Sequence, residues 1–259
     1  MKTSTNKILT VLSVCVLFLS YSCKKNLESS KKDLPISSDE ASEADAPGIY
    51  QTISGDIKLV LQPGDDKGQD AWIEFSPTNS VYATHKTGFA DQLKIWAWTD
   101  GGTVIDSRTL IRFDELFKVP STGIIRQATM YLYGLSEGSV HMPEGNSYYP
   151  GSPYRNYGPN DIYVQKVTSA WDENSVTWNT KPSATVIGES LISPSKTQWN
   201  YNASVDVTQI VKTFVKQPST NYGFLLSLTN ENTYRSMGFY SSESTNARKR
   251  PKLVIIYAN

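Results

Sequence analysis

Aromatic side chains gather in residues 138–160, a stretch otherwise rich in Gly, Pro and Asn. A connector longer than about fifteen residues is usually functional or disordered, and a disordered one would not normally hold four tyrosines. Aromatic rings offer a sugar a flat apolar face beside polar groups that bond its hydroxyls. The stretch therefore serves either ligand binding or simple loop packing, and its candidate ligand residues are Tyr148, Tyr149, Tyr154, Arg155 and Tyr157.

A second set of candidates lies on a predicted strand over residues 93–98. Successive side chains of a strand point to opposite faces, so Lys94, Trp96 and Trp98 share one face. In a β-sandwich that face is either buried or a binding platform. Because lysine is rarely buried without a partner, Lys94 favours exposure and a role in ligand binding.

Two arginines belong to the strand that follows. Arg108 and Arg112 lie four residues apart, so both point to the same side of that strand as Leu110. The mixed face has two interpretations. Either the arginines contact a ligand, or they form surface ion pairs with Asp106 or Asp114.

The chain offers few groups for catalysis. His85 and His141 are its only histidines, and neither lies in a nucleophile or zinc motif. A glycosidase built on two carboxylates distant in sequence stays open as a hypothesis. Asp172 and Glu173, however, are better explained as turn residues. We expect a protein that is not an enzyme.

One acidic cluster could hold a hard cation. Asp65, Asp66 and Asp70 surround two glycines and supply the carboxylate oxygens that Ca²⁺ prefers, but they lack the alternate-residue spacing of an EF-hand loop. A solvated turn is the favoured interpretation, with calcium as the alternative. No other cofactor is expected.

Composition and charge narrow the class of protein. Tyr, Thr, Ser, Val and Ile are frequent and long apolar runs are few, which favours many short strands. The chain has 25 basic and 25 acidic side chains, and 23 of the basic ones follow Cys23. A nucleic-acid-binding protein would normally carry a basic excess, so no nucleic-acid partner is expected.

The first 22 residues predict export. Lys2 and Lys7 precede an apolar run over residues 8–19 that is too short to span a bilayer. Cys23 follows directly, with Ser22 before it, which resembles the lipobox of bacterial lipoproteins in which that cysteine is lipidated. We expect an outer-membrane lipoprotein at the cell surface, bound to the membrane only by its lipid. Secretion after cleavage near Ser22 is the alternative.

Downstream, the sequence predicts a flexible tether over residues 23–50 and one sandwich domain over residues 51–259. The tether is rich in Ser, Lys and acidic residues and nearly lacks aromatic ones, so it cannot bury enough apolar surface to offset the entropy of ordering. Alternating apolar residues then predict strands at 57–61, 71–75, 93–98, 109–113, 124–135, 162–167, 222–228, 237–240 and 252–257.

One segment departs from this alternation. Val207, Ile210, Val211 and Phe214 fall at the spacing of one helical face, and Asp206 is a suitable cap. A short helix is therefore expected near residues 206–216, inside an all-β, jelly-roll-like sandwich of two sheets.

Several sequence blocks carry a family resemblance. Trp171 and Trp178, seven residues apart among turn-forming residues, are best explained as aromatic anchors of a corner between strands, with sugar stacking as the alternative. The blocks are residues 70–73 (DAWI), 108–114 (RTLIRFD), 171–182 (WDENSVTWNTKP), 205–208 (VDVT), 221–224 (NYGF), 239–243 (FYSSE) and 250–253 (RPKL). In order and spacing they resemble the DNRLRE domain family over residues 55–259.

The resemblance implies an extracellular, non-catalytic β-sandwich of carbohydrate-binding-module type. Some members bind alginate, and in those relatives basic residues of the N-terminal half hold the uronate carboxylates. The matching region here offers Lys86, Lys94, Arg108 and Arg112. We therefore expect capture of an extracellular polysaccharide, with an acidic, alginate-like polymer as one candidate. Other surface polysaccharide-utilisation proteins are expected as partners. A structural or adhesive spacer without a glycan ligand is the competing hypothesis.

Overall fold

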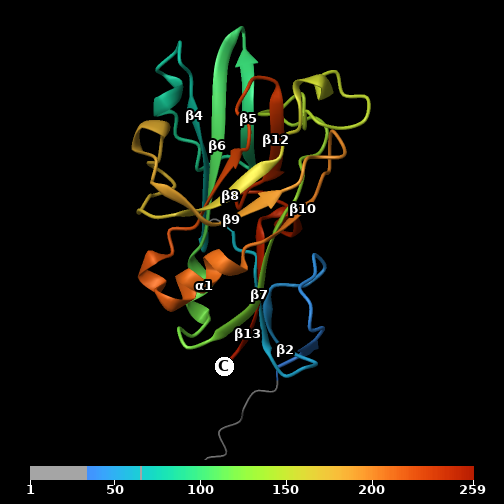
Figure 1. Ribbon diagram of the computed structural model, residues 1–259, viewed down its shortest axis with the longest axis vertical. Coiled ribbons are helices and arrows are strands. Elements are labelled where there is room, and N and C mark those ends of the chain that lie inside the picture. Colours follow the sequence, from blue (N-terminus) through green and yellow to red (C-terminus); the bar gives the residue numbers. More distant parts are fainter. Residues whose placement is uncertain (1–33, 65) are drawn as a thin grey trace, which may run out of the picture. The chain divides into compact units, whose positions relative to one another are not determined.

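Two β-sheets and one α-helix make up the part of the chain that the computed structural model describes, residues 34–64 and 66–259 (Figure 1). One sheet has the strand order β1-β2-β3-β13-β7-β10. Its pairs are antiparallel except β1 with β2. The strands are β1 (Ile36–Ser37), β2 (Gly48–Thr52), β3 (Ile57–Leu61), β13 (Lys252–Ala258), β7 (Ile124–Leu132) and β10 (Ala203–Asp206).

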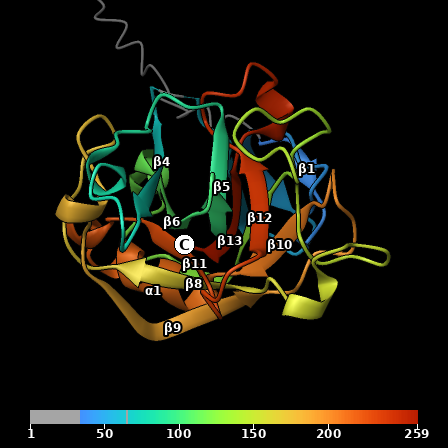
Figure 2. The same ribbon diagram turned by 90° about the horizontal axis from the view of Figure 1, so that it is seen from above.

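The second sheet branches at a long central strand, β6 (Thr103–Phe113). Along one edge of β6 runs β4 (Gly68–Phe75). Along the other edge, β5 (Gln92–Asp100) pairs with the first half of β6 and β11 (Phe224–Leu228) with the second half. Seen from above, β4 and β5 stand on either side of β6 (Figure 2). The sheet is completed by β12 (Arg235–Tyr240) beside β5, and by β8 (Ile162–Val167) and β9 (Ala184–Ile192) beyond β11.

A single large hydrophobic cluster fills the space between the sheets. Leu93, Ile95 and Ala97 of β5 face into it, as do Phe113 of β6 and Phe224 of β11. The apolar face of α1 (Thr208–Lys216) joins the same cluster, and Asp206 Oδ1 accepts a hydrogen bond from the Thr208 amide at 2.8 Å. The prediction of a two-sheet, all-β sandwich with one short helix is confirmed.

A smaller cluster lies on the outer face of the second sheet. Trp171 and Val176 cover Leu110 of β6 and Leu225 of β11. The indole of Trp171 donates to the Tyr222 carbonyl at 2.8 Å, so its single polar atom is satisfied. Trp178 packs against this cluster and stacks on Phe75. Both tryptophans are therefore corner anchors, as the turn-rich sequence around them predicted.

Short 3-10 helices connect several of these strands. They are η1 (Tyr82–Thr84), η2 (Asp114–Lys118), η3 (Arg155–Tyr157), η4 (Trp178–Thr180), η5 (Pro218–Thr220) and η6 (Ala247–Lys249). In the described residues no helix is long and apolar enough to cross a membrane.

The segment over residues 34–50, predicted as part of a flexible tether, instead supplies β1 and part of β2 to the first sheet. Two buried lysines hold it. Lys58 of β3 donates to the Glu40 carbonyl at 2.6 Å and pairs with Asp45 at 3.2 Å. Lys252 of β13 donates to the carbonyls of Glu43 and Asp45 at 2.6 and 2.7 Å. Composition argued for disorder, but charge-assisted hydrogen bonds order this polar segment, together with the packing of Ala41 and Tyr50 on the cluster that includes Tyr133. The expected signal peptide (1–22), Cys23 and the first part of the tether lie outside the described residues.

Candidate functional site

A cavity of about 420 Å³ opens beside β5, and we refer to it as the groove. Its lining comes from four strands, one 3-10 helix and one loop. The lining residues are Glu74 of β4, Tyr82 of η1, Ile105 of β6, Ser236 of β12, Lys94, Trp96, Trp98, Thr99 and Asp100 of β5, and residues 140–145.

Strand alternation places the aromatic groups of the groove. Leu93, Ile95 and Ala97 point into the main core, so Trp96 and Trp98 point to the opposite face. Their rings are nearly parallel, with an interplanar angle of 14° and centroids 6.4 Å apart. Trp96 is partly exposed, whereas Trp98 is 8% exposed. Both rings line the groove, and an indole ring offers a sugar an apolar face to stack upon.

The polar centre of the groove is Glu74. Its carboxylate lies 2.5 Å from the Lys94 ammonium, accepts a hydrogen bond from Ser107 at 3.3 Å and lies 3.1 Å from His85 Nδ1. Burial would raise the pKa of Glu74, but the charge of Lys94 and hydrogen bonds from Lys94 and His85 outweigh it and hold the pKa below its usual value. The carboxylate is thus held ionised between fixed partners.

Lys94 is buried, with 7% of its surface exposed, and not solvent-exposed as expected from its type. Burial lowers the pKa of its ammonium, an effect that Glu74 opposes. The ammonium also lies 4.1 Å from the ring centroid of Trp96 and 4.9 Å from that of Trp72. Ion pairing and cation–π contacts together explain how the charge is accommodated. Lys94 is therefore part of the groove lining, and its ammonium lies over the Trp96 ring.

The loop that closes the groove is fastened to its neighbours. The amide of Gly238 donates to Asn146 Oδ1 at 3.1 Å, and the amide of Ser236 donates to Ser147 Oγ at 3.0 Å. His141 packs on Trp72 with ring centroids 5.1 Å apart. These contacts fix residues 140–145 as a preformed wall, as ligand sites generally require.

Aromatic contacts continue from Trp98 beyond the groove. Tyr154 meets Trp98 edge-on with centroids 4.6 Å apart, and Tyr234 does so at 5.3 Å. Tyr157, which is half-exposed, packs against Tyr234 at 4.7 Å. A nearly continuous aromatic surface therefore runs from Trp96 to Tyr157, and it joins two parts of the sequence that were predicted separately.

Comparison with known proteins agrees with a sugar-binding site. Residues 151–257 match the model of carbohydrate-binding module family 96. The chain therefore carries a domain of carbohydrate-binding-module type, and carbohydrate binding is supported at that general level. The family is one of binding modules, which agrees with the expectation of a non-enzyme.

The segment that matches family 96 forms much of the β-sandwich but little of the groove lining. It contains β8 to β12 and nearly all of β13, together with Tyr154, Tyr157 and Tyr234. The groove lining, in contrast, lies between Glu74 and Gly145 except for Ser236. The match thus supports carbohydrate binding in general. The residues before the matched segment form most of the groove surface.

A stretch of 96 residues is 36% identical to the tRNA3(Ser)-specific nuclease WapA of Bacillus spizizenii. These residues make up 37% of this chain and 4% of that protein. The chain thus corresponds to a small part of this curated relative.

The structure separates the four candidate tyrosines of residues 138–160 into two groups. Tyr154 and Tyr157 join the aromatic surface beside the groove. Tyr148 lies under the guanidinium of Arg155 at 4.7 Å, and Tyr149 is partly buried; neither they nor Arg155 line the groove. The backbone carbonyl of Tyr148 accepts a hydrogen bond from Ser195 Oγ at 2.7 Å, so residues 148 and 149 pack against the fold.

The predicted arginines are engaged in ion pairs. Arg108 makes two hydrogen bonds to Glu231, at 2.7 and 2.8 Å, and lies over the Trp178 ring. Glu231 is distant in sequence, and neither Asp106 nor Asp114 takes this place. Arg112 pairs with Asp114 at 2.5 Å, as the ion-pair interpretation predicted.

These arginines also lie on the outer face with Leu110, away from the groove lining. Lys86 is exposed in the loop between η1 and β5, again outside that lining. The four cations proposed to hold uronate carboxylates are therefore not brought together, and only Lys94 reaches the groove.

The acidic residues weighed for calcium and for turns are also rearranged. Asp66 is exposed, Asp65 lies outside the described residues, and Asp70 is buried in β4. Asp172 accepts turn hydrogen bonds as predicted, but Glu173 is buried and accepts a hydrogen bond from the Asp70 amide at 2.7 Å. Glu173 is thus more than a turn residue.

Proposed function

We propose that the protein captures a polysaccharide outside the cell by stacking sugar rings on the Trp96 side of the groove. The observation that carries the proposal is the near-parallel Trp96 and Trp98 pair, which forms one wall of a 420 Å³ cavity with polar groups beside it. A flat aromatic face next to fixed hydrogen-bonding groups is the arrangement that sugars require. The resemblance to DNRLRE domains and the family 96 match support the same class of ligand.

The charges of the groove favour a neutral polymer. Its lining has three carboxylates, Glu74, Asp100 and Glu144, against the single ammonium of Lys94, which Glu74 already pairs. An acidic polymer such as alginate would meet net negative charge there. Arg108 and Arg112, the cations that favoured an acidic ligand, are already paired with Glu231 and Asp114.

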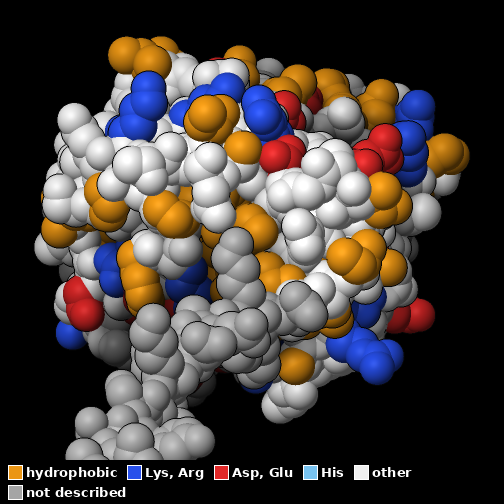
Figure 3. Space-filling view, turned by 90° about the horizontal axis from the view of Figure 1, so that it is seen from below, with side chains coloured by type: hydrophobic (Ala, Val, Ile, Leu, Met, Phe, Trp, Pro, Cys, Tyr) orange, Lys and Arg blue, Asp and Glu red, His pale blue; other side chains and the backbone are white. Residues whose placement is uncertain are grey.

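A hydrolase or lyase receives no support from the groove. A glycosidase acid needs a raised pKa, but that of Glu74 is lowered. Nucleic acid is also disfavoured as a partner, because the chain has no excess of basic over acidic side chains. On the face that Figure 3 shows, the two kinds lie among one another. The Bacillus relative is a nuclease, but this chain matches only 4% of it, so that activity is not proposed here.

The module would act at the cell surface. Residues 1–22 have the pattern of an export signal, and Cys23 has the position of a lipidated cysteine. We expect anchoring in the outer membrane and delivery of captured glycan to other surface polysaccharide-utilisation proteins. Metabolic labelling of expressing cells with an alkyne fatty acid should label the protein, and Cys23→Ser should remove the label. Label retained in that variant would contradict lipidation at Cys23.

The ligand class is tested by affinity electrophoresis in gels containing neutral glucan, mannan or xylan, or alginate. We expect a neutral polymer to retard the protein. The Tyr148→Ala/Tyr149→Ala variant should be retarded equally, because neither ring lines the groove. Loss of retardation in that variant would show that the sugar binds at residues 138–160 and not in the groove.

Two other outcomes would change the proposal. Retardation by alginate alone would favour the acidic ligand and the arginine-bearing face. If folded protein is retarded by no polymer, the module is a structural or adhesive spacer.

A further inference from the structure

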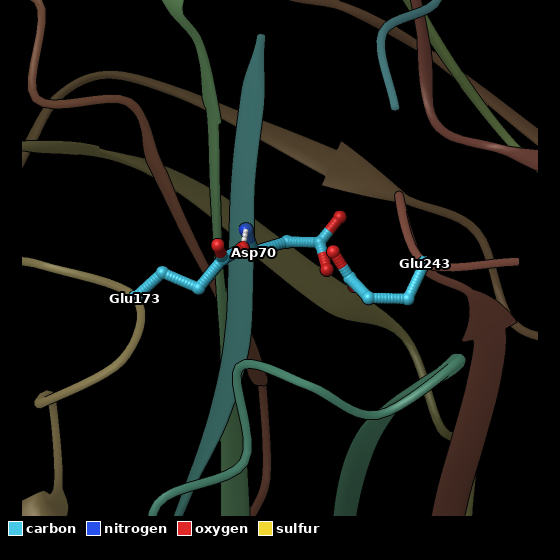
Figure 4. Close-up of side chains that lie close together, drawn as sticks. All are labelled: Asp70, Glu173 and Glu243. Carbon is cyan, nitrogen blue, oxygen red and sulfur yellow. Dashed lines mark hydrogen bonds between the residues drawn. The ribbon is translucent and has the colours of Figure 1, made fainter. Parts of the chain in front are cut away.

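Three carboxylates from distant parts of the sequence meet at one point, away from the groove lining. Asp70 comes from β4, Glu173 from the turn after β8 and Glu243 from the turn after β12. One oxygen of each lies within 4.8 Å of an oxygen of the other two. In Figure 4 the carboxylates of Asp70 and Glu243 face each other, and Glu173 approaches from the other side of β4.

In each carboxylate one oxygen accepts a hydrogen bond that fixes the orientation of the group. Glu173 Oε1 accepts from the Asp70 amide at 2.7 Å, and Asp70 Oδ2 accepts from the Ser242 amide at 2.8 Å. Glu243 Oε1 accepts from Ser242 Oγ at 2.8 Å. Carboxylates that ligate metals are commonly oriented by outer hydrogen bonds of this kind.

The remaining oxygens include two that are buried and unpartnered. Asp70 is 2% exposed, and its Oδ1 has no hydrogen-bond partner in the described structure. The same holds for Glu243 Oε2. A buried polar atom without a partner is costly and calls for an explanation. In Figure 4 the buried carboxylate of Asp70 points toward Glu243.

The charge of the cluster is also uncompensated. Among the ion pairs of residues 34–64 and 66–259, none involves Asp70, Glu173 or Glu243. Asp70 and Glu173 are buried, and buried charges are costly unless they are paired or bind a cation.

We propose that Asp70, Glu173 and Glu243 form a Ca²⁺-binding site. Two oxygens bound to one Ca²⁺ at about 2.4 Å are at most about 4.8 Å apart, which is the limit within which these oxygens lie. The cluster contains only hard oxygen ligands, which suits Ca²⁺ better than a transition metal. Ca²⁺ accepts irregular carboxylate sets completed by water, whereas Mg²⁺ demands a near-ideal octahedron.

β4, the turn that carries Glu173 and the turn after β12 are connected through side chains at this point. The ion would join these three segments. A Cβ on Gly88 would lie 2.3 Å from the Glu173 carbonyl, so the loop before β5 also packs tightly at this point. Trp72 and Glu74 follow Asp70 on the same strand, and Glu74 lines the groove. The ion thus stabilises the strand that carries the polar centre of the groove.

The test is calorimetric titration of the purified full chain with CaCl₂ after EGTA treatment, together with thermal unfolding. We expect one Ca²⁺ per chain. At about 100 times its dissociation constant, Ca²⁺ should raise Tm by about 5–10 °C relative to EGTA. MgCl₂ at the same concentration should give less than half of that shift.

Asp70→Asn and Glu243→Gln keep the side-chain shapes and should each remove the Ca²⁺-dependent shift. Asp172→Asn, an exposed neighbour of Glu173 outside the cluster, should keep it. The absence of both binding heat and a Tm shift in the unmodified protein would overturn the proposal without any variant. A shift that persists in both cluster variants would assign Ca²⁺ to other carboxylates and overturn it equally. Glycan retention is a separate measurement, so failure of this proposal is distinguishable from failure of the proposed function.

Discussion

Trp96→Ala should weaken polysaccharide binding by at least about tenfold. Aromatic residues that anchor an interface commonly contribute about 2 kcal/mol or more, which corresponds to more than a tenfold change in affinity. Trp96 is the choice because it is partly exposed in the groove, whereas Trp98 also packs on Tyr154 and Tyr234 and its loss would disturb the fold. The measurement is affinity electrophoresis over a concentration series of the polymer that retards the unmodified protein.

Phe117→Ala is the matched control. Phe117 is an aromatic residue of η2 that is 70% exposed and does not line the groove, so its loss should leave retardation unchanged. Trp96→Phe should recover part of the binding because it restores an aromatic face. Equal retardation of Trp96→Ala and the unmodified protein would show that the sugar lies elsewhere.

Lys94→Met should lower the free energy of unfolding by about 3–5 kcal/mol, since removing one partner of a buried ion pair leaves the other charge uncompensated. Glu74 would keep only Ser107 and His85 as partners. Urea unfolding monitored by tryptophan fluorescence measures the change.

The pH dependence of the free energy of unfolding has a definite sign. Because the pKa of Glu74 is lowered in the fold, its stabilising contribution is present above the usual glutamate pKa and is lost as the pH falls below it.

The double variant Lys94→Met/Glu74→Leu separates charge from packing. Replacing both members of a buried pair by apolar groups is often neutral, so most of the lost stability should return. If Lys94→Met alone costs less than about 1 kcal/mol, the pair is weaker than its burial implies and Lys94 is free to contact ligand.

The sequence predicts strands well where apolar residues alternate along the chain. Residues 57–61 and 162–167 alternate clearly and match β3 and β8. β9 was not predicted, because this edge strand is only partly buried and its apolar residues Val186, Ile187 and Leu191 are exposed. β10 was also missed, because it has only four residues. Such short or exposed strands depend on their neighbours more than on their own pattern.

The candidate site was predictable in part. Alternation placed Lys94, Trp96 and Trp98 on one face, and the structure confirms that arrangement. The partners of that face were not predictable, because Glu74 arrives from another strand through a pairing with β6 that no local pattern encodes.

Other contributions to the groove were missed for the same reason. Glu144, which lines the groove, and Tyr234, which packs on Trp98 beside it, come from loops whose positions depend on the whole fold. The Asp70 cluster joins residues up to 173 positions apart along the chain. Its only sequence signal was that each member lies within a separate family-like block.

The two lysines that hold residues 34–50 also limit how far the fold can stand from Cys23. An extended chain covers at most about 3.5 Å per residue. With residues 34–50 bound to the sheet, eleven steps separate Cys23 from Leu34, a maximum of about 40 Å. A free segment up to Gln51 would allow roughly 100 Å. For a module fixed by a lipid on Cys23, Lys58 and Lys252 thus decide the height above the bilayer at which a glycan can be held.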